Sequence, residues 1–409
     1  MTNEVKNVPE IRFPEFSGEW EENKLNNYLK TSKIKNTQKK YNKQDVLSVS
    51  GYFGIVNQIE FQGRSFAGAS VASYGIVETG DIVYTKSPLK SSPYGIIKVN
   101  KGESGIVSTL YAIYKPLQNV DANFVENYFT NDLRLNKYLK PLVNKGAKND
   151  MKVSDDNALI GDVIFPKYIE EQIKISKFFS KLDRQIELEE EKLELLEQQK
   201  RGYMQKLFSQ ELRFKDYNGN EYPNWEVKKL QEIIEVKDGT HESPKPIDKG
   251  YLLVTSKNLK NNKLDFSESY NISKEDYENI NKRSKVEIGD ILFGMIGTIG
   301  NPILLKEEGF AIKNVALLKT NNLQEKYFIL NFLKSIAIAK QFHKMNAGGT
   351  QKFISLGTIR NLKIDIPSPE EAIKIGDFLN KIDELIENQS KKIDFLKQRK
   401  KGLLQKMFV

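Results

Sequence analysis

The chain has 409 residues, a length typical of two or three domains. With 39% hydrophobic and 29% charged residues, it has enough apolar side chains for packed cores, and general disorder is excluded. It contains no cysteine and only two histidines, His241 and His343. This composition excludes disulfides, thiolate metal sites, a cysteine nucleophile and a multi-histidine metal centre.

The net charge of +9 is compatible with a polyanionic partner but does not require one. It divides into +4 for residues 1–169, −1 for 170–208, +4 for 209–369 and +2 for 370–409. The N-terminal residues lack the apolar core of a signal peptide, and glycines and a proline interrupt the most apolar stretch, 291–305. We therefore expect a cytoplasmic protein.

Residues 1–165 predict a first region of short strands and loops. Runs of Val, Ile, Tyr and Phe alternate with Gly, Pro, Asn and Ser, and one amphipathic helix is predicted near residues 122–139. The loops combine glycine, hydroxyl, amide and lysine side chains, which suit contacts with phosphates and base edges. The candidate DNA-binding residues of this region are Ser50, Tyr52, Lys86, Ser87, Lys90, Lys145 and Lys148.

Residues 166–210 predict one long helix. From Ile175 to Leu207, apolar residues recur with alternating steps of four and three, which is the heptad pattern of left-handed helix pairing. Pro166 lies just before the helix, where a missing N–H costs nothing.

Residues 211–366 predict a second mixed region, with an amphipathic helix near 324–344, and residues 367–409 predict a second long helix. Each loop by itself is typical of an ordinary surface turn, and only the repeated placement in both halves favours function. His241 is either a base oriented by Glu242 or a hydrogen-bonding loop residue; the lack of histidine in the first half favours the second role. The candidate DNA-binding residues here are Thr240, His241, Ser256, Lys257, Thr298, Thr350, Gln351 and Lys352.

The chain is a tandem repeat. Residues 170–208 and 370–408 share 18 of 39 residues without a gap. Arg12, Phe13 and Trp20 have counterparts in Arg213, Phe214 and Trp225, and Gly80-Asp81-Ile82 resembles Gly289-Asp290-Ile291. The last residues of either helix would continue equally well into either opening motif. This cyclic order predicts a pseudo-twofold arrangement in which each terminus lies beside the other half.

The two long helices are expected to pair antiparallel within one chain rather than between two molecules. Polar residues interrupt both seams at equivalent positions, Glu189 and Gln389, then Lys200 and Lys400. They either fix the register of the pair or lie at half-exposed positions where lysine stems reach solvent. The predicted central seam residues are Leu182, Ile186, Glu189, Leu193, Leu196, Ile382, Ile386, Gln389, Ile393 and Leu396.

No catalytic motif is present in the sequence: it has no phosphate-binding loop with its lysine, no methyltransferase tetrad and no nucleophile elbow. Paired carboxylates such as Asp155-Asp156 are typical of solvated turns. Three hypotheses remain: a non-catalytic DNA-reading subunit, an enzyme with an unrecognised site, and a scaffold that binds proteins.

The order of variable region, helix, variable region, helix resembles the specificity (S) subunit of type I restriction–modification enzymes. The resemblance covers essentially the whole chain. The first half has Gly146-Ala147-Lys148-Asn149 where the second has Gly348-Gly349-Thr350-Gln351, and Ala372 replaces Gln172, so the sequence departs from the pattern at these points. The resemblance rests on the helix motif Pro-x-x-x-Glu-Glu-Gln-x-x-Ile-x-x-Phe-Phe-x-x-Leu-Asp at 166–183 with its counterpart at 367–383, the endings Gln205-Lys206-Leu207-Phe208 and Gln405-Lys406-Met407-Phe408, the opening Arg12-Phe13-Pro14 with Trp20, Gly289-Asp290-Ile291-Leu292 and Gly349-Thr350-Gln351-Lys352.

The resemblance implies a mixed α/β (α+β) fold in which two target recognition domains, 1–165 and 211–366, are joined by a pair of long antiparallel coiled-coil helices, 166–210 and 367–409. Each domain would read half of a bipartite site in double-stranded DNA. The helix pair would set the gap and dock two modification (M) subunits. These subunits would carry S-adenosylmethionine and methylate adenine at N6, while restriction (R) subunits would supply cleavage driven by ATP with Mg. The chain itself would carry no cofactor, metal or catalytic residue.

Overall fold

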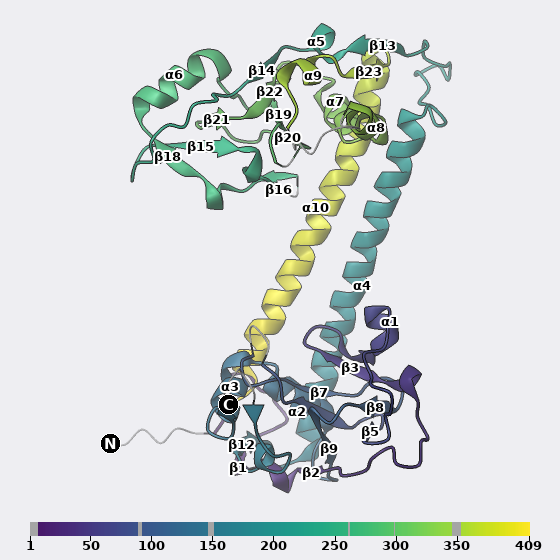
Figure 1. Ribbon diagram of the computed structural model, residues 1–409, viewed down its shortest axis with the longest axis vertical. Coiled ribbons are helices and arrows are strands. Elements are labelled where there is room, and N and C mark those ends of the chain that lie inside the picture. Colours follow the sequence, from purple (N-terminus) through teal and green to yellow (C-terminus); the bar gives the residue numbers. More distant parts are fainter. Residues whose placement is uncertain (1–6, 89–91, 146–150, 261, 298, 346–352) are drawn as a thin grey trace. The chain divides into compact units, whose positions relative to one another are not determined.

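A computed structural model of the protein describes residues 7–88, 92–145, 151–260, 262–297, 299–345 and 353–409 (Figure 1). Its contacts divide the chain into two compact units: residues 1–190 with 392–409 form unit 1, and residues 191–391 form unit 2. Each unit contains one globular region and parts of both long helices, α4 (Ile169–Phe208) and α10 (Pro369–Lys406). Figure 1 shows each of these helices as one unbroken coil.

The globular region of unit 1 is built around a four-stranded antiparallel sheet. Its strand order is β2 (Leu29–Thr31), β9 (Tyr111–Pro116), β6 (Ile82–Thr85) and β7 (Ile97–Val99). The two-stranded sheets are β1 (Glu21–Lys24) with β12 (Asp162–Phe165), β3 (Leu47–Ser50) with β4 (Gly54–Asn57), β5 (Gly75–Val77) with β8 (Gly105–Val107), and β10 (Asn144–Lys145) with β11 (Met151–Lys152). The short helices are α1 (Gln58–Gln62), α2 (Ala122–Phe129) and α3 (Asp132–Leu139).

The globular region of unit 2 has a four-stranded antiparallel sheet with the same connectivity between its strands. Its strand order is β14 (Val236–Asp238), β22 (Val315–Leu318), β19 (Ile291–Gly294) and β20 (Gly300–Leu304). The other sheets are β18 (Tyr270–Ile272), β15 (Tyr251–Thr255) and β21 (Ala311–Lys313), then β13 (Glu226–Lys229) with β23 (Lys363–Ile366), and β16 (Leu259–Lys260) with β17 (Lys263–Leu264). The short helices are α5 (Leu230–Ile233), α6 (Lys274–Ser284), α7 (Lys326–Leu333), α8 (Ile336–Met345) and α9 (Leu356–Arg360).

The predicted single helices at 122–139 and 324–344 are wrong in one respect, because each is two helices. Asn131 is extended between α2 and α3, and its side chain accepts hydrogen bonds from the next N–H groups as an N-cap. In unit 2, α7 ends at Leu333, and the N–H of the C-cap residue Lys334 donates to the carbonyls of Asn331 and Phe332. The apolar periodicity continues through both breaks, and neither glycine nor proline marks them, so the pattern alone did not reveal the turn.

The end of each long helix belongs to the core of a globular region from the other half of the sequence. In unit 1, Phe408 packs against Trp20, Phe124 and Phe179, with ring centroids 6.2, 5.4 and 5.9 Å away. In unit 2, Phe208 lies 5.3 Å from Phe332. The prediction that each terminus lies beside the other half is therefore confirmed within each unit.

The same hydrogen bond closes both units. The Ile11 N–H donates to the Lys406 carbonyl at 2.9 Å, and the Leu212 N–H donates to the Lys206 carbonyl at 3.0 Å. Only the second of these joins residues that are close in sequence. The end of α10 thus meets the opening motif of the chain as the end of α4 meets the second opening motif.

A buried glutamate near the start of each long helix fixes the opening motif. Glu171 is 1% exposed and accepts two hydrogen bonds of 2.7 Å from Arg12 and one of 3.3 Å from the Trp20 indole. In unit 2, Glu371 is bound in the same way by Arg213 and Trp225, at 2.7 and 3.1 Å for their shortest contacts. A bidentate pair of this kind satisfies a carboxylate that would otherwise be costly to bury. The repeated Arg and Trp therefore have a structural role.

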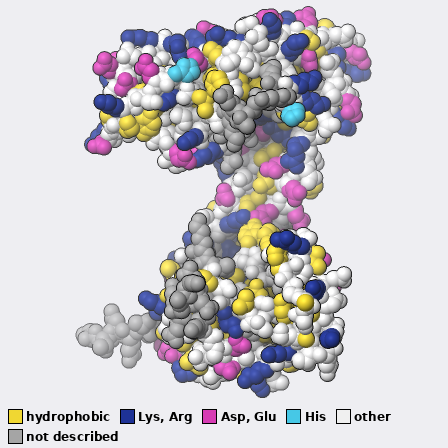
Figure 2. All heavy atoms as spheres, in the orientation of Figure 1, with side chains coloured by type: hydrophobic (Ala, Val, Ile, Leu, Met, Phe, Trp, Pro, Cys, Tyr) yellow, Lys and Arg dark blue, Asp and Glu magenta, His cyan; other side chains and the backbone are white. Residues whose placement is uncertain are grey.

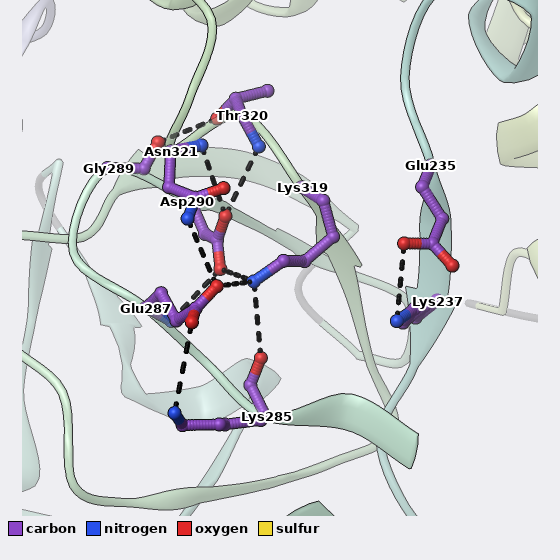
Figure 3. A network of polar contacts seen from close by, with 9 residues as sticks. All are labelled: Glu235, Lys237, Lys285, Glu287, Gly289, Asp290, Lys319, Thr320 and Asn321. Carbon is purple, nitrogen blue, oxygen red and sulfur yellow. Dashed lines mark hydrogen bonds and ion pairs between the residues drawn. The ribbon is translucent and has the colours of Figure 1, made fainter. Parts of the chain in front are cut away.

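The repeated Gly-Asp sequence also has a structural role, as Figure 3 shows for unit 2. Asp290 is fully buried and accepts hydrogen bonds from the Glu287 N–H and from Lys319, at 2.9 and 2.6 Å. Burial lowers the pKa of Lys319, but hydrogen bonds to Asp290 and Glu287 outweigh it and raise that pKa overall. The hydrogen bond from Lys319 lowers the pKa of Glu287. In unit 1, Glu78, Asp81 and Lys115 form the same network.

The two long helices run antiparallel in both units. In unit 1, Asp183 pairs with Lys400, and Glu189 pairs with Lys392 at 2.5 Å. In unit 2, Lys200 pairs with Asp383 at 2.6 Å, so the two seam lysines make equivalent ion pairs. Lys200 is only 9% exposed, which contradicts the interpretation of this position as a half-exposed one.

The ten predicted seam residues occupy buried or half-buried positions. The buried ones are Leu182, Ile186, Gln389, Ile393 and Leu396, and the half-buried ones are Glu189, Leu193, Leu196, Ile382 and Ile386. Among the helices of the described residues, none is long and apolar enough to cross a membrane.

Candidate nucleic-acid interface

Four loops of unit 2 that carry predicted contacts meet at one end of its sheets. The loop after β14 is fixed to the end of β21, because the Thr240 N–H donates to the Ile312 carbonyl at 3.0 Å and the Asn314 N–H donates to the Thr240 carbonyl at 3.1 Å. A side chain at Gly239 would lie 2.2 Å from the Ile312 carbonyl oxygen, so only glycine permits this approach.

Ser256 joins two further loops to the same place. Its hydroxyl donates to the Asn314 carbonyl at 3.1 Å and accepts from the Met295 N–H at 3.2 Å. The side chain is 3% exposed, so this predicted DNA-binding residue holds the loops together and does not face solvent. Lys257, the next residue, is exposed.

The segment just before Thr298, residues 295–296, pairs with the segment just after Lys352, residues 353–354. Ile296 bridges to Phe353, and the Ile354 N–H donates to the Met295 carbonyl at 2.9 Å. Thr298, Thr350, Gln351 and Lys352 themselves lie outside the described residues.

His241 lies at the exposed edge of this loop cluster. Its Nδ1 is 2.8 Å from Oδ1 of Asn314, and its Nε2 is 2.9 Å from Oδ2 of Asp238. Arg283 contacts the other oxygen of Asp238 at 3.0 Å and donates to the Gly239 carbonyl at 2.8 Å. The partner of His241 is therefore Asp238, not Glu242 as in the base hypothesis. The role as a hydrogen-bonding loop residue is the one the geometry supports.

In unit 1, the predicted contacts are less concentrated. Ser50 ends β3, and its hydroxyl accepts from the Tyr52 and Phe53 N–H groups in the β3–β4 hairpin. The Tyr52 ring is 68% exposed, and its hydroxyl donates to Glu190 of α4 at 3.0 Å. A hydrogen bond from Lys397 lowers the pKa of Glu190. This hairpin therefore touches the long helices.

The other predicted contacts of unit 1 have mixed placements. Lys86 pairs with Asp155 at 2.7 Å, and its side chain is only 18% exposed. Ser87 is half-buried. The backbone of Lys145 lies in β10, but its side chain is outside the described set, as are Lys90 and Lys148 entirely.

Sequence reasoning missed a cationic loop in unit 1. Residues 32–46 join β2 to β3 and contain five lysines and one acidic residue. Residues 239–250, which join β14 to β15, occupy the corresponding place in unit 2 and have two lysines and two acidic residues. The local density of lysine in residues 32–46 could have indicated this loop, but a net charge counted over a whole region does not show such a local concentration.

On the face drawn in Figure 2, Lys and Arg lie among acidic and uncharged side chains. Among the side chains that the structure describes, no three His, Asp or Glu residues are grouped as metal ligands would be.

Residues 222–398 match the family model of the type I restriction modification DNA specificity domain. The type I restriction enzyme MjaVIII specificity subunit of Methanocaldococcus jannaschii is 27% identical over 257 residues, covering 58% of this chain and 59% of that subunit, which is less than two thirds of it. The putative MjaX specificity subunit of the same organism is 24% identical over 351 residues, covering 82% of this chain and 78% of the other.

Solved structures show the same fold. The S subunit of a type I restriction-modification system from M. genitalium has a TM-score of 0.61 at 14% identity, covering 98% of this chain and 99% of that one. A chain from work on complex assembly and conformational transition of the type I R-M system has a TM-score of 0.55 at 14% identity, covering 95% and 97%. The resemblance seen in the sequence is thus confirmed: residues 222–398 are a type I restriction modification DNA specificity domain, in a chain with the fold of type I S subunits.

Proposed function

We propose that this chain is the non-catalytic DNA-specificity subunit of a type I restriction–modification complex. One observation carries the proposal: the sheet order of the matched domain in unit 2 recurs in unit 1. Two domains with one frame and different loops suit a DNA site with two different halves, each read by one domain. Modification subunits would supply S-adenosylmethionine, and restriction subunits would supply ATP and Mg, so recognition would be the task of this chain.

The long helices would set the gap between the half-sites and dock the modification subunits. The 40 residues of α4 span about 60 Å at 1.5 Å per residue, or roughly 18 base pairs at 3.4 Å each. Each helix also has apolar side chains that a partner helix would cover, because Leu188, Leu195, Leu385 and Phe395 are 48–65% exposed.

The decisive experiment exchanges residues 11–165 for the corresponding region of another S subunit. Cells that express the hybrid with its modification partner are analysed by modified-base sequencing. We expect one half-site to change while the other half and the gap remain. A change in both halves would contradict independent reading, and the reciprocal exchange of 212–366 is the matched control.

The gap is tested by inserting one heptad into each long helix, after Glu190 and after Lys391. A heptad keeps the apolar seam in phase and adds about 10 Å, or roughly three base pairs. Both half-sites should be retained with a longer gap. Methylation at the original gap would exclude the helix pair as the spacing element. The chain purified alone should neither methylate nor cleave duplex DNA; either activity would favour an enzyme instead.

A further inference from the structure

We propose that residues 33–43, here called the lysine turn, grip the phosphate backbone of duplex DNA, so that unit 1 contributes more salt-dependent affinity than unit 2. The inference rests on the proposed function and assigns a binding role to a segment outside the candidate loops. The lysines of the turn are Lys33, Lys35, Lys39, Lys40 and Lys43, all of them exposed.

The lysine turn has a defined shape. Asn36 is 1% exposed, and its side chain donates to the Tyr41 carbonyl at 2.8 Å and accepts from the Tyr41 N–H at 3.0 Å. Its own N–H donates to the Tyr74 carbonyl at 2.9 Å. Lys39 lies between the two residues in the left-handed region, with φ of 55°. A buried amide therefore holds the lysines on a preformed turn, which reduces the ordering cost of binding.

The positive charge of the turn is only partly neutralised within the protein, where Lys40 interacts electrostatically with Glu78. Lys33 has an acidic partner, Asp156, but at 3.9 Å and with both side chains exposed. The Lys40 ammonium lies 5.2 Å from the Tyr41 ring centroid. Among the described residues, Lys35, Lys39 and Lys43 form no ion pair. Like charges held close together repel one another, and a polyanion relieves that repulsion and releases its own counterions.

The position of the turn favours DNA as that polyanion. Its loop connects the edge strand of the four-stranded sheet to the next strand, as 239–250 does in unit 2. In unit 2 that loop carries Thr240 and His241, which belong to the candidate interface. The net charge is +4 for residues 32–46 and zero for residues 239–250. Equivalent loops would therefore contact the two half-sites with unequal electrostatics.

The test measures the salt dependence of binding by the full-length chain to a random-sequence 40-base-pair duplex. The variant combines Lys35→Gln, Lys39→Gln and Lys40→Gln. A matched control removes the same charge from exposed lysines that have carboxylate partners, namely Lys24→Gln, Lys167→Gln and Lys174→Gln. Circular dichroism and tryptophan fluorescence verify that each variant is folded.

For the turn variant, we expect the slope of log K against log salt to fall by roughly 2–3, since each lost phosphate contact removes about 0.9. Affinity near 0.1 M salt should fall at least about tenfold, and the control should change the slope by less than about one. Modified-base sequencing should return unchanged half-sites, because phosphate contacts carry no sequence information.

Equal slopes for the turn variant and the control would overturn the inference and leave the proposed function intact. A folded wild-type chain that shows no salt-dependent binding to duplex DNA would instead overturn the proposed function. If cells that express the turn variant with its modification partner methylate a different half-site, the inference is also contradicted, because the turn would then read bases.

Discussion

The two globular regions share a buried frame and differ in their loops. Both have the same order of four strands, the same glutamate bound by Arg and Trp, and the same buried Asp-Lys network. The loops at the ends of these sheets differ in length, charge and side-chain chemistry. Packing restricts the choice of residue in the buried frame, whereas exposed loops are free of that restriction.

The equal net charges of the two regions conceal the difference between their loops. Residues 1–169 and 209–369 each carry a net charge of +4, so their totals do not distinguish the two regions. In the structure, unit 1 concentrates lysine on one turn, while the equivalent loop of unit 2 contains the contacts among Asp238, His241 and Arg283. Regional charge therefore indicates that a polyanion is a suitable partner, but the local arrangement decides how each region would hold it.

The shared glutamate anchor offers the largest effect. Glu171→Ala leaves the guanidinium of Arg12, which is 13% exposed, without its partner, and Glu371→Ala does the same to Arg213. Removing one member of a buried ion pair costs about 3–5 kcal/mol. Each substitution should lower the free energy of unfolding of its own unit by that amount.

Trp20 and Trp225, the only tryptophans, report on the two units separately in urea titrations. Substitution of one tryptophan by phenylalanine isolates the signal of the other unit. If Glu171→Ala shifted the Trp225 transition as much as the Trp20 transition, the two units would not be independent frames.

The seam ion pairs should differ in strength between units. The side chains of Lys200 and Asp383 are 11% and 31% exposed, whereas those of Lys400 and Asp183 are 22% and 37% exposed. Greater exposure means more solvent screening, so Asp383→Ala should cost about 2 kcal/mol and Asp183→Ala about 1 kcal/mol. Double-mutant cycles with the lysines replaced by methionine measure each coupling; equal couplings would contradict a role for burial.

The cost of replacing the glycine of each Gly-Asp turn should differ only slightly between the two units. Gly80 and Gly289 both have φ of +90°, which costs a residue with a side chain about 1 kcal/mol. A Cβ at Gly289 would also lie 3.1 Å from the Asn321 Cα, while one at Gly80 would meet nothing within 4 Å. Gly289→Ala should therefore destabilise its unit by about 1–2 kcal/mol, slightly more than Gly80→Ala does. Thermal unfolding followed at each tryptophan measures both.

The sequence predicted the frame because the frame is repetitive. A heptad seam over about five heptads and an offset of 200 residues require no knowledge of tertiary contacts, and both long helices and their antiparallel pairing followed from them. The break between α2 and α3, after Phe129, and the break between α7 and α8, after Leu333, were not predictable from periodicity. The helices on both sides of each break bury apolar faces. Their positions depend on capping and packing in three dimensions.

The candidate interface was predictable only in part. Thr240, His241, Ser256 and Lys257 were selected by residue type, and the fold brings their loops together around Asn314. Residue type did not reveal that Ser256 would be buried or that Lys86 would be paired with Asp155. These outcomes depend on long-range contacts that leave no local pattern.

The smallest expected effect concerns Lys334, a position where unit 1 has no lysine. Lys334 is the C-cap of α7 in unit 2, and the equivalent C-cap of α2 in unit 1 is Thr130. Burial, reinforced by the charge of Lys200 and only partly offset by Asp383, lowers the pKa of Lys334 to about 8. The unfolded chain keeps that proton up to about pH 10.4. The cost of burying the charged lysine is therefore fully present below pH 8 and diminishes as the pH rises from 8 to 10.

Lys334→Met should therefore stabilise unit 2 by about 1 kcal/mol at pH 7, allowing for partial exposure, and by much less at pH 9.5. Urea midpoints of the variant relative to wild type, read from Trp225 at both pH values, measure this difference. The same comparison at Trp20 should show none, and a gain independent of pH would assign the effect to packing rather than to charge.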